Sequence, residues 1–290
     1  MESAGEKKGR LQMRQGCRLI QILLILGAML LGPPALAADK VLRLGTLPVV
    51  SSRAAYEIYQ PLMESLEKGL ALSSVQLETP PNFRGMYQRI QENGFDLLIS
   101  PPHIARLAQK RLGWHPLVMF LPEHQAILLA READGPANLD ALRGSTIAVL
   151  DNNALVAIVM MDALAKRGLQ MGRDFKVIET RSYDSSQIAL TQGVAQAMVF
   201  RSQGFIDSNA RNQLKILLQA GVLPGYVVIA SPGTNKLELQ RLRTQLLAFG
   251  KTPEATPFFQ KLGYDSLSTA TEEAMRRLDP YLATTEAKLK

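Results

Sequence analysis

The sequence predicts an α/β fold with two lobes, each a mainly parallel β-sheet with flanking helices. Short apolar runs bounded by turn residues alternate with longer segments of helical periodicity, which is the pattern of βα units. From Lys236 onward the pattern is helical, with too few strands for a third domain. We therefore expect this segment to return to the first lobe. Two crossover strands, near residues 124–131 and 214–227, would then join the lobes.

The first lobe is predicted from three strands and three helices. Apolar runs that stop at Gly, Pro or Thr mark the strands, and apolar residues three and four apart mark the helices. The spacing of Phe83, Met86, Tyr87 and Ile90 is one such helical pattern. The strands are predicted at VLRLGTLP (41–48), VQLET (75–79) and FDLLISPP (95–102), and the helices from about Arg53, within 81–94 and over 103–111.

The second lobe repeats the alternation with new segments. Strands are predicted at QAILLAR (125–131), STIAVLD (145–151), FKVIET (175–180) and AQAMVF (195–200), with helices over 153–167 and 185–192. Glycines at 168 and 193 close the two helices. The strands LKILLQ (214–219) and YVVIASPG (226–233), joined by AGVLPG, then lead back toward the first lobe. The predicted domains are therefore 38–124 with 222–290 for lobe 1, and 125–221 for lobe 2.

The N-terminus is predicted to be a cleavable signal peptide, residues 1–37. Five basic residues precede an apolar run of 13 residues, which is followed by Gly-Pro-Pro and the small-residue site Ala35-Leu36-Ala37. A membrane anchor is the competing interpretation, but about 20 apolar residues are needed to cross a bilayer. Translation starts at either Met1 or Met13, and the mature protein is expected in the periplasm.

Composition excludes several functional classes. Cleavage removes Cys17, so the mature chain has no thiol and depends on its core for stability. It would carry 28 basic against 24 acidic residues, with no Lys/Arg block of the kind that binds nucleic acid. Three histidines without ligand spacing predict no metal site, and no cofactor motif is present. Without a recognisable catalytic motif, we expect no enzyme.

Taken in order, several segments resemble the phosphate, phosphite and phosphonate substrate-binding components of ABC importers, a branch of the type II periplasmic binding proteins. The resemblance covers essentially the whole mature chain. It is carried by LRLGTLP, YEIYQPLMESLEKGL, MYQRIQENGFDLLISPP, LDALRGSTIAVLDNN and VLPGYVVIASPG. It implies two lobes that close on one small molecule and then dock on a membrane permease, without catalysis.

Three departures from the family pattern concern the ligand. Phosphonate-binding members place a Ser/Thr-rich run and a Gly where this chain has Ala154, Leu155, Val156 and Ala157. A hydrogen bond to a charged group contributes about 1.5–3 kcal/mol, so three lost donors would weaken phosphonate binding about a thousandfold or more. Tyr183 replaces the family's His, and Gln196 stands near the position of its usual Asp.

Candidate ligand residues follow the predicted strand ends, where a cleft between lobes would lie. Each also has a structural interpretation. The asparagines and serines are predicted mainly as helix caps, His103 as a ligand or surface residue, Arg181 and Arg201 as cations that replace the missing hydroxyls, and the aromatic residues as stacking or core residues. The candidates are Ser51, Ser52, Phe83, His103, Asn152, Asn153, Arg181, Tyr183 and Arg201.

The leading hypothesis is an exported solute-binding protein that captures a phosphorus oxyanion-like or other small organic molecule and delivers it to an ABC permease. The alternative is a periplasmic sensory or adaptor module in which the same lobes recognise a membrane receptor. Both predict a small-molecule ligand, a membrane permease or sensor as partner, no nucleic acid and a monomer.

Overall fold

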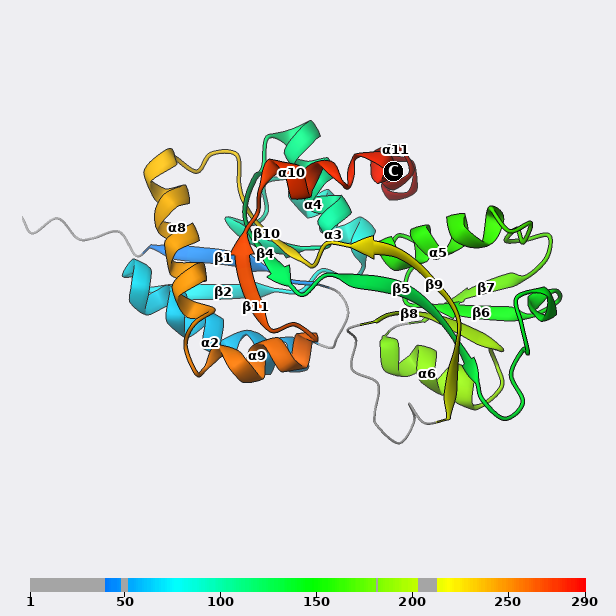
Figure 1. Ribbon diagram of the computed structural model, residues 1–290. Coiled ribbons are helices and arrows are strands. Elements are labelled where there is room, and N and C mark those ends of the chain that lie inside the picture. Colours follow the sequence, from blue (N-terminus) through cyan, green and yellow to red (C-terminus); the bar gives the residue numbers. More distant parts are fainter. Residues whose placement is uncertain (1–39, 48–51, 181, 203–212) are drawn as a thin grey trace, which may run out of the picture. The chain divides into compact units, whose positions relative to one another are not determined.

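The structure is a computed structural model that describes residues 40–47, 52–180, 182–202 and 213–290. This part of the chain contains two β-sheets, each flanked by helices (Figure 1). The six-stranded sheet has the strand order β11-β4-β10-β3-β1-β2, and the five-stranded sheet has the order β7-β6-β8-β5-β9. We call the layers built on these sheets the first and second lobe.

The strands of the first lobe are β1 (Val41–Gly45), β2 (Ser74–Glu78), β3 (Leu97–Ser100), β4 (His115–Leu121), β10 (Val227–Ala230) and β11 (Ser266–Thr269). Its helices are α2 (Ser52–Leu70), α3 (Phe83–Gln91), α4 (Pro102–Leu112), α8 (Lys236–Phe249), α9 (Ala255–Leu262), α10 (Glu272–Arg276) and α11 (Leu282–Leu289), with a short η2 (Asp279–Tyr281). The second lobe contains β5 (His124–Arg131), β6 (Thr146–Val149), β7 (Lys176–Glu179), β8 (Ala197–Arg201) and β9 (Leu214–Leu223), with η1 (Asp140–Leu142), α5 (Leu155–Ala165) and α6 (Tyr183–Thr191).

Each sheet has a parallel part, formed by β2-β1-β3 in the first lobe and β7-β6-β8 in the second. The remaining strands pair antiparallel, so both sheets are mixed rather than mainly parallel. The physical reason is that β5 and β9 neighbour each other as the outgoing and returning strands, which run in opposite directions. Strands β4 and β11 were not predicted, and β11 interrupts the C-terminal segment that was expected to be entirely helical.

The two connections between the sheets are short. The first runs from β4 to β5 through the cis Leu121–Pro122 bond, and the second from β9 to β10 through Gly225. Arg277 braces both connections, because its guanidinium binds the Glu123 carboxylate and the Val222 carbonyl, the latter at 3.2 Å. A side chain from the C-terminal segment thus links the β4–β5 connection to the end of β9.

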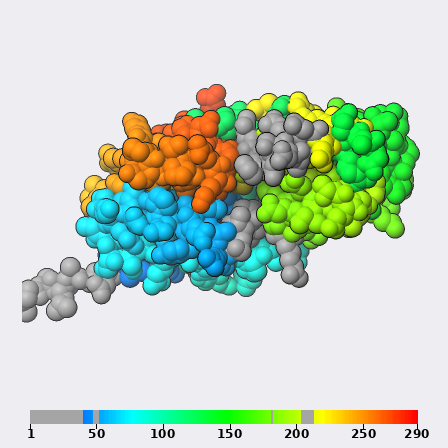
Figure 2. Space-filling model, turned by 90° about the horizontal axis from the view of Figure 1, so that it is seen from below, coloured from blue at the N-terminus to red at the C-terminus, as the bar shows by residue number. Residues whose placement is uncertain are grey.

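The C-terminal helices pack on the first lobe. Helices α8 and α9 lie against α2, and α11 lies against α3 and α4. Figure 2 shows the orange C-terminal helices beside the blue and cyan N-terminal ones. Arg106 of α4 is fully buried and binds Asp279 at 2.6 Å and Glu272 at 3.0 Å. This buried cation is matched by two carboxylates.

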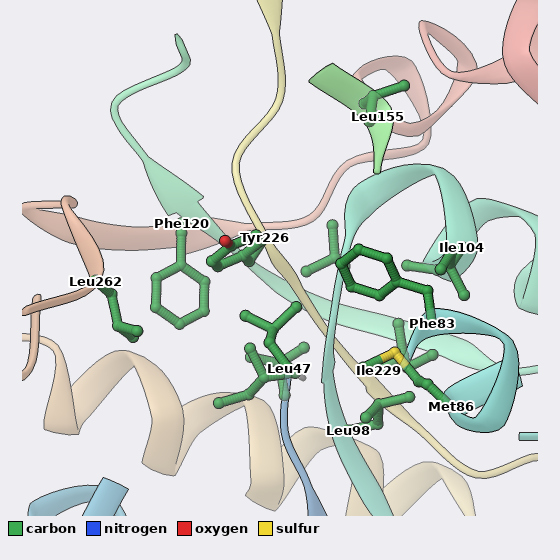
Figure 3. Packing of buried hydrophobic residues seen from close by; sticks show 14 of the residues in the cluster. Leu47, Phe83, Met86, Leu98, Ile104, Phe120, Leu155, Tyr226, Ile229 and Leu262 are labelled. Carbon is green, nitrogen blue, oxygen red and sulfur yellow. The ribbon is translucent and has the colours of Figure 1, made fainter. Parts of the chain in front are cut away.

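The main hydrophobic core includes residues from both lobes. Phe83 and Ile104 of the first lobe belong to the same buried cluster as Leu155 of α5 (Figure 3). A second, smaller cluster lies between α6 and the five-stranded sheet. Among the described helices, none combines the length and the hydropathy that a membrane span requires.

Candidate functional site

The loop between β6 and α5 lies where the sequence predicted a ligand site, and its amides are already occupied. The Asn152 N–H donates to Glu179 Oε1 at 2.8 Å, and the Asn153 N–H donates to Asp151 Oδ1 at 2.7 Å. Burial raises the pKa of Asp151, while the main-chain amides of Asn153 and Phe83 act in the opposite direction. The protein's own carboxylates thus take the donors that an anion would need here.

The prediction that Asn152 and Asn153 cap the following helix is wrong. The cap position of α5 is Ala154, which makes no side-chain cap hydrogen bond. The reason is a turn in front of the helix: the Ala154 N–H donates to the Asp151 carbonyl, so α5 begins only at Leu155. The first turn of α5 is therefore apolar and buried.

His103 lies in the first turn of α4 and is fully buried, so its interpretation as a surface residue is wrong. Its Nε2 lies 2.8 Å from the Asn153 carbonyl, which joins the first lobe to the second. Burial lowers the pKa of His103 to about 4, although the Asn153 carbonyl favours the charged form. At neutral pH His103 is an uncharged contact between the lobes.

A polar pocket of about 540 Å³ adjoins the β6–α5 loop. Its lining includes two basic residues, Arg84 and Lys288, and two acidic residues, Asp151 and Glu179. The positive and negative charges balance, which gives the pocket no preference for an anion. The pocket is lined by Asn82, Arg84, Asp151, Asn152, Asn153, Glu179, Ala287 and Lys288.

A second polar group lies around Arg201, the last residue of β8. The Arg201 side chain is only 7% exposed, and its Nη2 donates to the Leu262 carbonyl in the first lobe. The guanidinium carbon lies 5.3 Å from the ring centre of Tyr226 and 5.1 Å from that of Tyr264. His124 packs edge-on against Tyr264, with ring centres 6.4 Å apart. Arg201 is thus enclosed by residues of both lobes and both connections.

The Arg201 cluster, which we define as Thr46, Tyr59, His124, Arg201, Tyr226 and Tyr264, contains unused polar atoms. Among the described residues, these buried atoms have no hydrogen-bond partner: Thr46 Oγ1, Tyr59 OH, His124 Nδ1, Tyr264 OH, and Nε and Nη1 of Arg201. The Thr46 hydroxyl lies close to that of Tyr59, and the Tyr264 hydroxyl lies close to Arg201, but neither pair makes a hydrogen bond of normal geometry. Buried polar groups are normally paired, so this concentration of unpaired atoms indicates a place for a polar ligand.

At neutral pH the Arg201 cluster carries a single charge, the positive charge of Arg201. Burial raises the pKa of Tyr59 and Tyr264, so both hydroxyls stay protonated and can donate. Burial, reinforced by the charge of Arg201, lowers the pKa of His124 to about 3, so this ring is neutral. Arginine remains protonated in proteins. In the described part of the chain, the guanidinium of Arg201 pairs with no carboxylate.

The predicted site residues fall in different places. Tyr183, the first residue of α6, packs edge-on against Phe200, with ring centres 4.5 Å apart. Burial raises the pKa of Tyr183 and the charge of Arg201 acts against this stronger effect, so the predicted residues Tyr183 and Arg201 lie near each other. Phe83 is a core residue, and Ser52 is exposed at the start of α2. Ser51 and Arg181 lie outside the described residues.

The two buried histidines predict that acid destabilises the protein. Both titrate near pH 6.5 when unfolded, but near pH 4 and pH 3 when folded. Their stabilising contribution is complete above pH 6.5 and decreases as the pH falls toward the folded values, because the unfolded chain takes up protons first. We expect the free energy of unfolding at pH 5 to be lower by about 2 kcal/mol per histidine.

Urea denaturation at pH 7.5 and pH 5 measures this effect. His103→Gln keeps an N–H donor for Asn153 and should remove about half of the pH dependence. An unchanged slope in His103→Gln would contradict the assignment.

Comparison with known proteins identifies the family. Residues 44–275 match the family described as "ABC transporter, phosphonate, periplasmic substrate-binding protein". The chain belongs to this family. No curated protein sequence is similar enough to refine the assignment further.

Solved structures show the same two-lobed fold. The binding component of an ABC phosphonate transporter from Pseudomonas aeruginosa is 15% identical, with TM-score 0.74, over 87% of this chain and 89% of that one. PhnD1 of Prochlorococcus marinus, solved with methylphosphonate, is 13% identical, with TM-score 0.73, over 86% and 99%. The alkanesulfonate-binding protein of Xanthomonas axonopodis, bound to MOPS, is 14% identical, with TM-score 0.59, over 87% and 94%. The predicted type II periplasmic binding protein fold is confirmed.

Membership of this phosphonate-type family makes the chain a periplasmic solute-binding protein of an ABC transporter. The sequence had predicted Arg201 and its neighbour Tyr183, but no other member of the Arg201 cluster. A signal was present, since Thr46 lies within the first predicted strand segment (41–48), and His124 and Tyr226 lie in the predicted crossings. Tyr59 and Tyr264 gave no such signal, because only the packed fold brings them to this place.

Proposed function

We propose that the protein is exported by cleavage after Ala37, captures one small solute between its lobes and delivers it to an ABC permease. The lobes proposed are residues 38–124 with 222–290, and residues 125–221. Capture depends on groups that meet only when the lobes approach each other, as in other hinge-closing proteins. Arg201 of the second lobe, which contacts the Leu262 carbonyl of the first, is such a group.

The observation that carries this proposal is the set of unpaired buried polar atoms in the Arg201 cluster. Desolvating these groups without partners is costly, and a bound solute would supply the missing partners. Relatives of the same fold have been solved with methylphosphonate and with MOPS, both of which carry acidic headgroups. We propose that Arg201 and Tyr183 contact the solute, with Asn152 beside it and with His103 and Asn153 joining the two lobes.

A thermal-shift panel tests the proposal. It would contain phosphate, phosphite, phosphonates, sulfonates, carboxylates and small heterocycles, each added to the purified mature protein. A ligand at 100 times its dissociation constant should stabilise the folded state by about 2.7 kcal/mol, which raises Tm by several degrees. A well-folded protein that responds to no compound would contradict solute binding.

A periplasmic sensory or adaptor module is the second candidate. It is favoured by the first turn of α5, where the cap residue Ala154 offers no side-chain donor. The neighbouring reading frames distinguish the two functions. A permease and an ATPase support transport, whereas a histidine kinase or a diguanylate cyclase supports sensing.

A further inference from the structure

Two buried arginines of this protein differ in whether a carboxylate pairs with them. Arg106 is fully buried and is bound by the carboxylates of Asp279 and Glu272. Arg201 is almost as buried, but in the described part of the chain its neighbours are a carbonyl, two aromatic rings and the nearby Tyr264 hydroxyl, and none of them carries a full negative charge. An uncompensated buried charge is unfavourable and is normally neutralised by an ion pair. Among the described residues no carboxylate supplies this negative charge, and a bound acidic solute would supply it.

The donors around Arg201 fit an oxyanion. Its Nε and Nη1 are unpartnered, and so are the hydroxyls of Tyr59, Tyr264 and Thr46. Charged hydrogen bonds from guanidinium to an acidic oxygen are among the strongest that proteins make. The tyrosines stay protonated at neutral pH, so they can add neutral donors without changing the charge of the site.

The other place where an anion could bind is already satisfied. At the β6–α5 loop, the amides of Asn152 and Asn153 donate to Glu179 and Asp151. The first turn of α5 is lined by buried apolar side chains and contains no hydroxyl. The group that recognises the negative charge of the solute is therefore expected at the end of β8 and not at the start of α5.

We propose, building on the solute-binding function above, that the solute has a singly charged oxyacid headgroup, such as a sulfonate or a carboxylate, and carries no ammonium group. One guanidinium neutralises one negative charge, whereas a doubly charged phosphonate would leave a buried charge without a partner. An ammonium group would face Arg201 with no carboxylate of the described cluster to receive it.

Isothermal titration with a matched propyl series tests the charge rule. The probes are propanesulfonate, butyrate, the methyl monoester of propylphosphonate, propylphosphonate itself, 3-aminopropanesulfonate and butanamide, all at pH 9.5, where propylphosphonate is almost entirely doubly charged and the amine is still mostly protonated. The first three carry one negative charge and should bind. Propylphosphonate, the aminosulfonate and the neutral amide should each bind roughly tenfold more weakly or worse, and propylphosphonate should gain affinity at pH 6 as it takes up a proton.

Substitutions of Arg201 test its role in binding the charged headgroup. Arg201→Gln should weaken binding of the best singly charged probe roughly 10- to 100-fold, and Arg201→Lys should keep the preference for singly charged probes at lower affinity. Arg243→Gln is the matched control, because Arg243 also donates to a carbonyl, that of Leu117 at 3.3 Å, but belongs to α8 outside the cluster. Its affinity should equal that of the unchanged protein.

The outcomes separate the two proposals. Tighter binding of doubly charged propylphosphonate, equal binding of the aminosulfonate, or full affinity in folded Arg201→Gln would overturn the charge assignment while leaving solute binding intact. If Arg201→Gln does not fold, the probe series on the unchanged protein decides alone. If the protein binds no compound of this series or of the broader panel, both the charge assignment and the solute-binding function are wrong.

Discussion

Gly225→Ala is expected to lower the free energy of unfolding by about 3 kcal/mol or more. A methyl group at this position would lie 2.2 Å from the Phe120 carbonyl oxygen, well inside van der Waals contact. The neighbouring main chain is held by the hydrogen bond from the Phe120 N–H to the Tyr226 carbonyl at 2.8 Å, so neither connection between the lobes can yield easily. Chemical denaturation measures the loss.

Gly233→Ala is the matched control for this substitution. Gly233 lies just after β10, as Gly225 lies just before it, but a methyl group at Gly233 meets no atom within 4 Å. Replacing a glycine where the backbone accepts alanine stabilises by about 0.4–1 kcal/mol through the unfolded chain. Equal stability of the two variants would show that the second connection is not packed against β4 as described.

Phe120→Ala should cost about 3–5 kcal/mol and also weaken solute binding. The Phe120 ring is 1% exposed and lies 5.3 Å from the ring of Tyr264 and 6.1 Å from that of Tyr226. Figure 3 shows Phe120 beside Tyr226 in the core. Both tyrosine rings pack against the guanidinium of Arg201, so a cavity at Phe120 should loosen the groups that receive the solute.

Phe175→Ala separates the two effects of this change. Phe175 is 3% exposed in the second lobe, so its removal should cost a similar amount of stability. Because Phe175 is not part of the Arg201 cluster, affinity measured by titration under conditions where the protein is folded should be unchanged. If both variants lose affinity equally, the loss reflects general destabilisation and not the position of Tyr226 and Tyr264.

The parts of the fold that the sequence predicted are those in which local pattern and tertiary structure agree. Each predicted strand and helix lies within a few residues of an observed element, because apolar runs and helical spacing record which face is buried. Strand β11 was missed because SLST is short, largely polar and at the edge of its sheet. Strand β4 was missed because its apolar run follows α4 directly and ends at a proline.

The site was less accessible from sequence. Arg201 and Tyr183 could be named because strand ends face the space between lobes in this class of fold. Tyr59 and Tyr264 are separated by about 200 residues and meet only through packing of α2, α9 and the connections. The sequence correctly showed that α5 begins without hydroxyls, but it could not show that the adjoining amides are bound by Asp151 and Glu179.

The most direct test of the account is a crystal structure of the mature protein with propanesulfonate. We expect sulfonate oxygens within about 3.2 Å of the Nε or Nη1 atom of Arg201, with the tyrosine hydroxyls of the cluster as further donors. A sulfonate bound instead in the pocket beside Asn152 and Asn153, or anywhere out of reach of Arg201, would contradict the central claim that this buried arginine receives the solute.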